Sequence, residues 1–290
     1  MKIKFTLIMT LLSLVILGAC TYEKDNIIVN QELLDIESSY SNNVETYRMQ
    51  YLSDDFKVVG FIVKPKTIED KAPLLIFNRG GNREFGVINE KTLQYLSFWA
   101  DQGYVVLASQ YRGNDGGEGQ EELGGSDIND VLNLIHVAEE LPYVDMDQKV
   151  MLGASRGGMM TYLAIKHDLD IQAAAVISGV TDQLDLYEKR NDMKLILNEL
   201  VGDPILDREE YEKRSAVYWA DEIDVPTLIL HGEKDWRVPV DQARNMVDQL
   251  KKYQKDYKYI EYPYGDHSLS AYSDEYKKEI IDWFELYLNK

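Results

Sequence analysis

The stretch Gly153-Ala154-Ser155-Arg156-Gly157-Gly158 decides the fold of this chain. A short, mostly apolar run (residues 149–152) precedes it, and a run of helix-forming residues (159–165) follows it. A strand, a Gly-x-Ser-x-Gly turn and a helix in this order are typical of a nucleophile elbow, in which a strained turn exposes the serine hydroxyl. The alternative is a glycine-rich connection without chemistry. The elbow interpretation requires that an acid and a base follow further along the chain.

The length and the charge of the chain limit its class. Of its 290 residues, 45% are apolar, which is enough for one large domain with a substantial core. Acidic side chains outnumber basic ones by 50 to 31, which gives a formal charge of −19. Such a negative surface repels nucleic acid and anionic lipid headgroups, so neither is expected as a partner.

The first twenty residues have the composition of a targeting segment. Residues 1–4 carry two lysines, residues 5–17 are apolar, and Leu17-Gly18-Ala19-Cys20 ends the segment. The apolar part is too short to span a bilayer comfortably. The segment resembles a bacterial signal peptide with a lipobox, so we expect residues 1–19 to be removed and Cys20 to be lipidated. This predicts a protein anchored outside the cytoplasmic membrane; the alternative is an ordinary signal peptide and a spare thiol.

A polar segment separates Cys20 from the first predicted strands. Residues 20–43 are acidic and rich in Asn and Ser, and we expect a flexible tether that spans roughly 25–30 Å on average. The folded domain is expected over residues 44–290. Residues 44–50 and 56–64 look like strands joined by a polar turn, which predicts an antiparallel hairpin at the start of this domain.

Strand-like and helix-like segments alternate after the hairpin. The predicted strands lie at residues 74–77, 104–108, 149–152, 173–177, 227–230 and 258–262. The predicted helices lie at residues 91–102, 126–140, 159–165 and 272–288. This alternation predicts an α/β fold with a mostly parallel central sheet and helices on both of its faces. A charged segment at residues 181–224 interrupts the pattern and is expected to form a small helical cap.

A serine hydroxyl needs a base and an orienting carboxylate, because it is a poor nucleophile at neutral pH. Histidine is the natural base because its pKa lies near neutrality. Of the four histidines, His136 lies in a helix before the serine and His167 near the end of the helix after it. His231 ends a predicted strand and is expected to be structural. His267 lies in a loop after the last predicted strand, so it is the candidate base.

The acid is expected in the loop after the preceding strand. This loop reads His231-Gly232-Glu233-Lys234-Asp235-Trp236-Arg237-Val238-Pro239, and Asp235 is the candidate. Asp182, after the 173–177 strand, is the second choice, and Glu233 is a weaker one. Nucleophile, acid and base then follow in the order Ser155, Asp235, His267, which is the order of α/β-hydrolases.

From about residue 45 onward, the chain resembles an α/β-hydrolase and, more narrowly, the catalytic domain of the prolyl oligopeptidase family. Four motifs carry the resemblance: Gly103 to Leu107 with Tyr111-Arg112-Gly113, the elbow at 153–158, the His231 to Pro239 loop, and Asp266-His267. The family cleaves short peptides by acyl transfer through a serine, so the resemblance implies a serine peptidase. Full-length members usually carry a β-propeller, for which residues 21–43 are too short.

The resemblance also implies where the oxyanion is held. The backbone N–H of Arg156, directly after the nucleophile, is the expected first donor. The family places a tyrosine just before a glycine pair, whereas this chain has Phe77-Asn78-Arg79-Gly80-Gly81. We therefore expect the Arg79 guanidinium, or nearby backbone such as that of Gly80, to be the second donor; the alternative is a structural ion pair. This departure from the family favours an esterase somewhat.

Three functions stay open at this point. The first is a serine peptidase of prolyl oligopeptidase type, and the second is a carboxylesterase that acts on small or carbohydrate-linked esters. The third is a non-catalytic surface binding protein, against which the three intact triad residues count. We expect no cofactor and no metal, because the histidines are dispersed and residues 113–119 do not continue directly into a helix as a dinucleotide fingerprint does.

Overall fold

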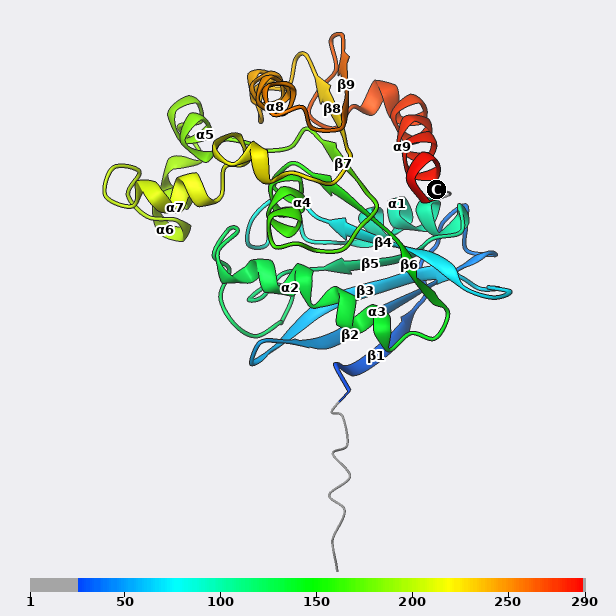
Figure 1. Ribbon diagram of the computed structural model, residues 1–290. Helices are drawn as coiled ribbons and strands as arrows, with labels where there is room; N and C mark the ends of the chain where they lie inside the picture. The colour runs from blue at the N-terminus through cyan, green and yellow to red at the C-terminus, as the bar shows by residue number, and fades with distance from the viewer. Residues whose placement is uncertain (1–25, 289–290) are drawn as a thin grey trace, which may run out of the picture.

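A single sheet organises the computed structural model, which describes residues 26–288 (Figure 1). The strand order in these residues is β1-β2-β3-β5-β4-β6-β7-β8-β9. The strands are β1 Ile28–Leu34, β2 Val44–Ser53, β3 Phe56–Pro65, β4 Ala72–Asn78, β5 Val105–Ser109, β6 Val144–Ala154, β7 Ala173–Ile177, β8 Thr227–Gly232 and β9 Tyr257–Tyr262. β1, β2 and β3 are antiparallel and β3 pairs antiparallel with β5, whereas all other pairs are parallel. The predicted α/β-hydrolase fold is confirmed.

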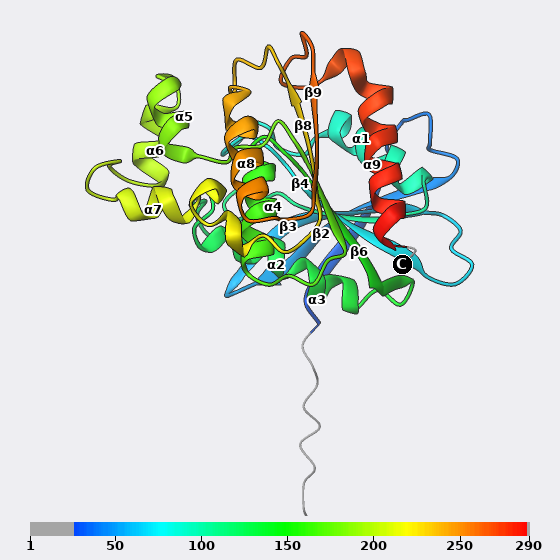
Figure 2. The same cartoon turned by 45° about the horizontal axis from the view of Figure 1, so that its top comes forward.

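Helices cover both faces of this sheet. They are α1 Glu90–Asp101, α2 Asn129–Leu132, α3 Leu134–Glu139, α4 Arg156–Lys166, α5 Gln183–Lys189, α6 Lys194–Leu200, α7 Arg208–Lys213, α8 Asp241–Lys252 and α9 Ser273–Leu288. α1 and α9 lie on one face, and α4 and α8 lie on the other (Figure 2). β5, β7 and β8 are buried along their whole length, because side chains on both faces are covered. None of the helices in residues 26–288 combines the length and the apolar composition that a membrane span requires.

The predicted cap lies between β7 and β8. Helices α5, α6 and α7 form it, and they extend beyond the sheet on the side of α4 and α8 (Figure 1). Each cap helix buries one large side chain in the main core, namely Leu186, Leu197 and Tyr211. The cap is therefore packed against the domain through its own hydrophobic contacts.

The helix that we predicted at residues 126–140 is divided. A 3₁₀ turn, Ser126–Ile128, leads into the short helices α2 and α3. The division coincides with two carboxylates that point into the protein, those of Asp127 and Asp130, and both are fully buried. Each pairs with a buried arginine. The positions of these two ion pairs, rather than one continuous amphipathic pattern, therefore determine the path of this segment.

Residues 28–34, which we expected in the flexible tether, instead form strand β1. This strand pairs with β2, and the N–H groups of Ile27 and Ile28 donate to the Glu140 carboxylate at 2.7 and 3.2 Å. Most positions of β1 are exposed, so backbone hydrogen bonds rather than apolar burial define the strand. A hydrophobic pattern could not have predicted it. The signal peptide and Cys20 lie outside the described residues.

Candidate active site

Ser155 lies on the turn between β6 and α4 with φ 57° and ψ −122°. This is an unfavourable conformation for a residue with a Cβ, and it is the strained turn expected of a nucleophile elbow. A Cβ at Gly157 would lie 1.9 Å from the Asn78 carbonyl oxygen, and one at Gly153 would lie 2.2 Å from the Gly157 carbonyl oxygen. The elbow therefore needs both glycines in order to pass so close to β4 and to itself.

The predicted acid and base meet in the structure. His267 Nδ1 lies 2.7 Å from Asp235 Oδ2, and Asp235 Oδ1 accepts from the N–H groups of Arg237 and Val238 at 2.8 and 3.0 Å. Burial raises the pKa of Asp235, but hydrogen bonds with His231 and His267 outweigh it and hold the pKa well below its usual value. An ionised Asp235 can thus orient the His267 ring and stabilise its charged form.

His231 stands behind this pair, as a structural histidine would. It is fully buried, and its Nε2 lies 2.8 Å from the Val238 carbonyl oxygen and 3.4 Å from Asp235 Oδ2. It ties the end of β8 to the loop that carries Asp235. Its position at the end of a strand was predictable from the sequence, but its contact with the acid was not.

The other two acid candidates have different partners. Asp182 caps α5, because its Oδ1 accepts from the N–H groups of Leu184 and Asp185 at 3.0 and 3.1 Å. The Glu233 carboxylate accepts from the N–H of Tyr264 and pairs with Lys234 at 2.9 Å. The geometry therefore favours Asp235 as the acid.

Ser155 and His267 line one cavity of about 280 Å³. The cavity lies between the loop after β4, the elbow and the cap. Its apolar lining consists of Phe85, Leu123, Val180, Leu186, Met193 and Val238. Three arginines, Arg156, Arg190 and Arg237, also line it. A mostly apolar cleft with a few converging polar groups is what a small-substrate site requires.

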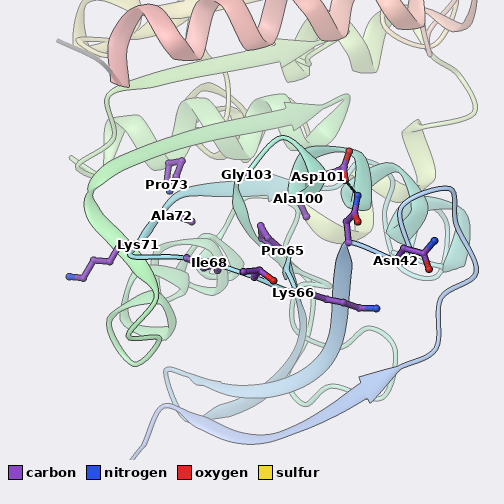
Figure 3. A pocket seen from close by; sticks show the side chains of 12 residues that line it. Asn42, Pro65, Lys66, Ile68, Lys71, Ala72, Pro73, Ala100, Asp101 and Gly103 are labelled. Carbon is purple, nitrogen blue, oxygen red and sulfur yellow. Dashed lines mark hydrogen bonds between the residues drawn. The ribbon is translucent and has the colours of Figure 1, made fainter.

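A larger hollow of about 500 Å³ lies at the other end of β4 (Figure 3). Ala72 and Pro73 line it at the start of that strand, whereas the Ser155 cavity adjoins the end of β4. Its charged lining comes from Lys66, Lys71 and Asp101. None of the three triad candidates belongs to it, so its size does not make it the catalytic site.

Two backbone segments lie beside Ser155. Arg156 is the first residue of α4, so its N–H has no acceptor within the helix. On the other side, a Cβ at Gly80 would lie 3.0 Å from Ser155 Cβ and 3.6 Å from Ser155 Oγ. Gly80 and Gly81 both line the cavity, and the Gly80 backbone lies close to the serine because it carries no Cβ.

The Arg79 guanidinium does not face the cavity, which contradicts the role we considered for this side chain. It donates to the carbonyl oxygens of Gln110 (3.0 and 2.8 Å), Gly80 (3.0 Å), Arg83 (3.3 Å) and Phe85 (3.5 Å). The reason is that the loop after β4, together with Gln110, brings these carbonyl groups around the buried Arg79 side chain, and a buried guanidinium needs acceptors. Burial, with repulsion from Arg156, lowers the pKa of Arg79 to about 10.

The chain combines a mostly parallel sheet with a nucleophile elbow, and its candidate residues follow in the order Ser155, Asp235, His267. Together these features define an α/β-hydrolase. A model described as the prolyl oligopeptidase family matches residues 91–290, which is more than half of the chain. The chain therefore belongs to the prolyl oligopeptidase family and is a serine hydrolase. A second model, described as acetyl xylan esterase, matches residues 21–131.

Individual relatives agree with this family. The chain is 33% identical over 221 residues to an uncharacterized peptidase, YtmA, of Bacillus subtilis, covering 75% of this chain and 84% of the relative. It is 25% identical over 245 residues to dipeptidyl-peptidase 5 of Aspergillus oryzae, covering 80% of this chain and 34% of the relative. Among solved structures, acylaminoacyl peptidase of Pyrococcus horikoshii is similar with a TM-score of 0.75 and 25% identity, over 86% of this chain and 42% of that one. The chain thus spans less than half the length of the last two proteins.

Proposed function

We propose that this chain is a serine peptidase of prolyl oligopeptidase type that works through Ser155, His267 and Asp235. The observation that carries the proposal is that His267, bonded to the buried Asp235 carboxylate, lines the same cavity as the elbow serine. Ser155 Oγ attacks the substrate carbonyl while His267 takes its proton, and Asp235 orients the ring. His267 then protonates the leaving amine as the C–N bond breaks and Ser155 keeps the acyl group. In the second half, His267 takes a proton from water, the water oxygen attacks the acyl carbonyl, and the proton returns to Ser155 Oγ as the acid leaves.

The backbone on both sides of Ser155 stabilises the negative charge that develops on the carbonyl oxygen. The first donor is the N–H of Arg156 at the start of α4, and the second comes from the Gly80–Gly81 segment. Donors of this kind are effective because they are already in place before the charge forms. This assignment keeps Gly80 in the oxyanion site and gives Arg79 a supporting position.

The surroundings of Arg237 support the proposal that the substrate has a polar acyl part. Of the ten arginines in residues 26–288, nine have a carboxylate oxygen within 4.0 Å, and Arg237 does not. Its guanidinium lies 5.4 Å from the centre of the Phe85 ring and 5.3 Å from that of Trp236, at the cavity. A guanidinium near two rings, with no carboxylate oxygen of residues 26–288 within 4.0 Å, can bind a carbonyl or carboxylate of the substrate.

A second candidate function is that of a carboxylesterase. The match of residues 21–131 to the acetyl xylan esterase model favours it, because these residues include the glycine loop beside the serine. An ester is also an easier substrate for the same acyl transfer, because its leaving group needs less protonation than an amine.

Parallel turnover of two substrates with the same acyl group separates these candidates. One substrate is a p-nitrophenyl ester of an acetylated amino acid, and the other is the corresponding p-nitroanilide. A peptidase hydrolyses both, and Ser155→Ala loses both activities. Hydrolysis of the ester alone, over a series of acyl groups, would support the esterase instead.

We also propose that Cys20 carries a lipid and that the domain acts in the bacterial cell envelope, outside the cytoplasmic membrane. The segment that ends at Cys20 supports this proposal by its charge, its apolar run and its small residues. The expected partners are a peptide or ester substrate and, through the anchor alone, the membrane.

A further inference from the structure

A buried cluster of charged side chains lies beside the two backbone segments of the proposed oxyanion site, which are the start of α4 and the Gly80–Gly81 loop. We call these segments the two walls of the site. The cluster consists of Arg79, Tyr111, Glu121, Asp127 and Arg156, whose side chains are all almost completely inaccessible to solvent. The two guanidinium carbons lie 5.0 and 4.5 Å from the centre of the Tyr111 ring. We call this set the arginine cluster. Burying two positive charges so close together is costly unless carboxylates compensate them.

Asp127 and Glu121 hold the guanidinium of Arg156. Arg156 Nη2 lies 2.7 Å from Asp127 Oδ2, and Nη1 lies 2.7 Å from Glu121 Oε1. The same Nη1 donates to the carbonyl oxygen of Gly81 at 3.2 Å. Arg156 therefore joins the two walls, because its backbone N–H belongs to the elbow and its side chain holds the glycine loop.

Arg79 holds the same loop from the other side. Its guanidinium donates to the carbonyl oxygens of Gly80 and Phe85, and its own carbonyl accepts from the Tyr111 hydroxyl at 3.0 Å. Glu121 Oε2 completes the arrangement by accepting from the N–H of Arg83 at 2.8 Å. Both guanidinium groups thus fix the backbone that faces Ser155.

We propose that Asp127 and Glu121 are positioning residues for the reaction, a proposal that rests on the function proposed above. They keep the Arg156 guanidinium in place, so that the Arg156 N–H and the Gly80–Gly81 backbone point at one position beside Ser155. An oxyanion site requires such rigidity, because a donor displaced by about 1 Å no longer follows the developing charge.

The test compares Asp127→Asn with Asp130→Asn. Asp130 is the control, because it is also fully buried and lies 2.7 Å from an arginine, Arg112, whose ion pairs in residues 26–288 are with Asp54 and Asp130 rather than with the loop beside Ser155. We expect Asp127→Asn to lower kcat by about 10- to 100-fold with little change in KM, less than the loss of a whole donor. The affinity for a trifluoromethyl ketone, whose adduct carries an oxyanion, should fall by the same factor. Asp130→Asn should lower the melting temperature and leave kcat and inhibitor affinity unchanged.

Glu121→Gln is the second variant, in case Asp127→Asn does not fold. Its remaining carbonyl oxygen can still accept from the Arg83 N–H, while the ion pair with Arg156 is lost. A folded Asp127→Asn or Glu121→Gln protein with wild-type kcat and inhibitor affinity would overturn the proposal. So would an Asp130→Asn protein with the same selective loss of kcat. Activity in Ser155→Ala would instead show that the proposed function itself is wrong.

Discussion

Asp235 and Asp182 show at the residue scale how two aspartates that both follow a strand come to differ. Asp235 is enclosed by two histidines and two backbone N–H groups, whereas the Asp182 carboxylate accepts from the first turn of α5. The order of the candidates along the chain pointed to Asp235. The contact between Asp235 and His267, which are 32 residues apart, comes from the parallel pairing of β8 with β9.

Asp235→Asn should lower kcat by roughly 10³–10⁴-fold, because asparagine keeps the shape but cannot stabilise the charged imidazole. Asp182→Asn should keep nearly full activity, because asparagine caps a helix about as well as aspartate. Steady-state kinetics of both purified variants checks this. An inactive Asp182 variant beside an active Asp235 variant would show that the acid has been placed after the wrong strand.

Arg237 belongs to the same scale. Arg237→Gln should raise KM for a substrate with a carboxylate on its acyl part, such as a succinylated aminoacyl p-nitroanilide, by about 10-fold or more. The acetylated substrate, which lacks the carboxylate, should be affected less. Arg190 lines the same cavity, but it pairs with Asp192 at 2.6 Å and donates to the Arg237 carbonyl oxygen, so we expect it to support Arg237 rather than bind the substrate carboxylate. Equal effects of Arg237→Gln on both substrates would rule out recognition of the carboxylate.

At the element scale, the loop that follows β4 forms the second backbone segment beside Ser155. Gly81 has φ 75°, and a Cβ there would lie 2.0 Å from the Phe85 carbonyl oxygen. Gly116 has a similar φ of 80°, but a Cβ there meets nothing within 4 Å. The pair therefore separates the effect of positive φ from that of the close approach.

Gly81→Ala should lower kcat by about 10²-fold or more, because the loop must move and takes its N–H donors with it. Gly116→Ala should only destabilise the fold, by about 1–2 kcal/mol for the positive φ. Thermal unfolding and kinetics of both variants test this. Comparable kcat values in the two variants would remove the loop from the oxyanion site.

The strands that the sequence predicted correctly are those whose formation depends on the burial of apolar side chains. Strands such as β5 and β7 are continuous apolar runs because both of their faces are covered. The prediction failed where hydrogen bonds or buried charge decide: β1 is exposed, and Asp127 turns inward to reach Arg156. Likewise, the sequence placed Arg79 beside the glycine pair but could not show which way its side chain points.

At the scale of the whole molecule, the proposed anchor and the acidic surface act together. A formal charge of −19 keeps the domain away from anionic headgroups, so membrane attachment would depend on Cys20. Cys20→Ser should therefore release the protein from the membrane fraction and abolish labelling with a fatty-acid analogue, while the activity of the domain stays unchanged. Equal labelling of wild type and variant would contradict the anchor.

We propose Ser155 as the nucleophile of this serine hydrolase. Mass spectrometry after treatment with a fluorophosphonate tests it most directly, because the reagent marks only an activated serine. We predict one adduct per wild-type chain, on the peptide that contains Ser155, and none on Ser155→Ala. That variant should keep its circular dichroism spectrum and lose kcat by a factor on the order of 10⁴–10⁶. An adduct on another serine, or retention of most activity in Ser155→Ala, would contradict the account.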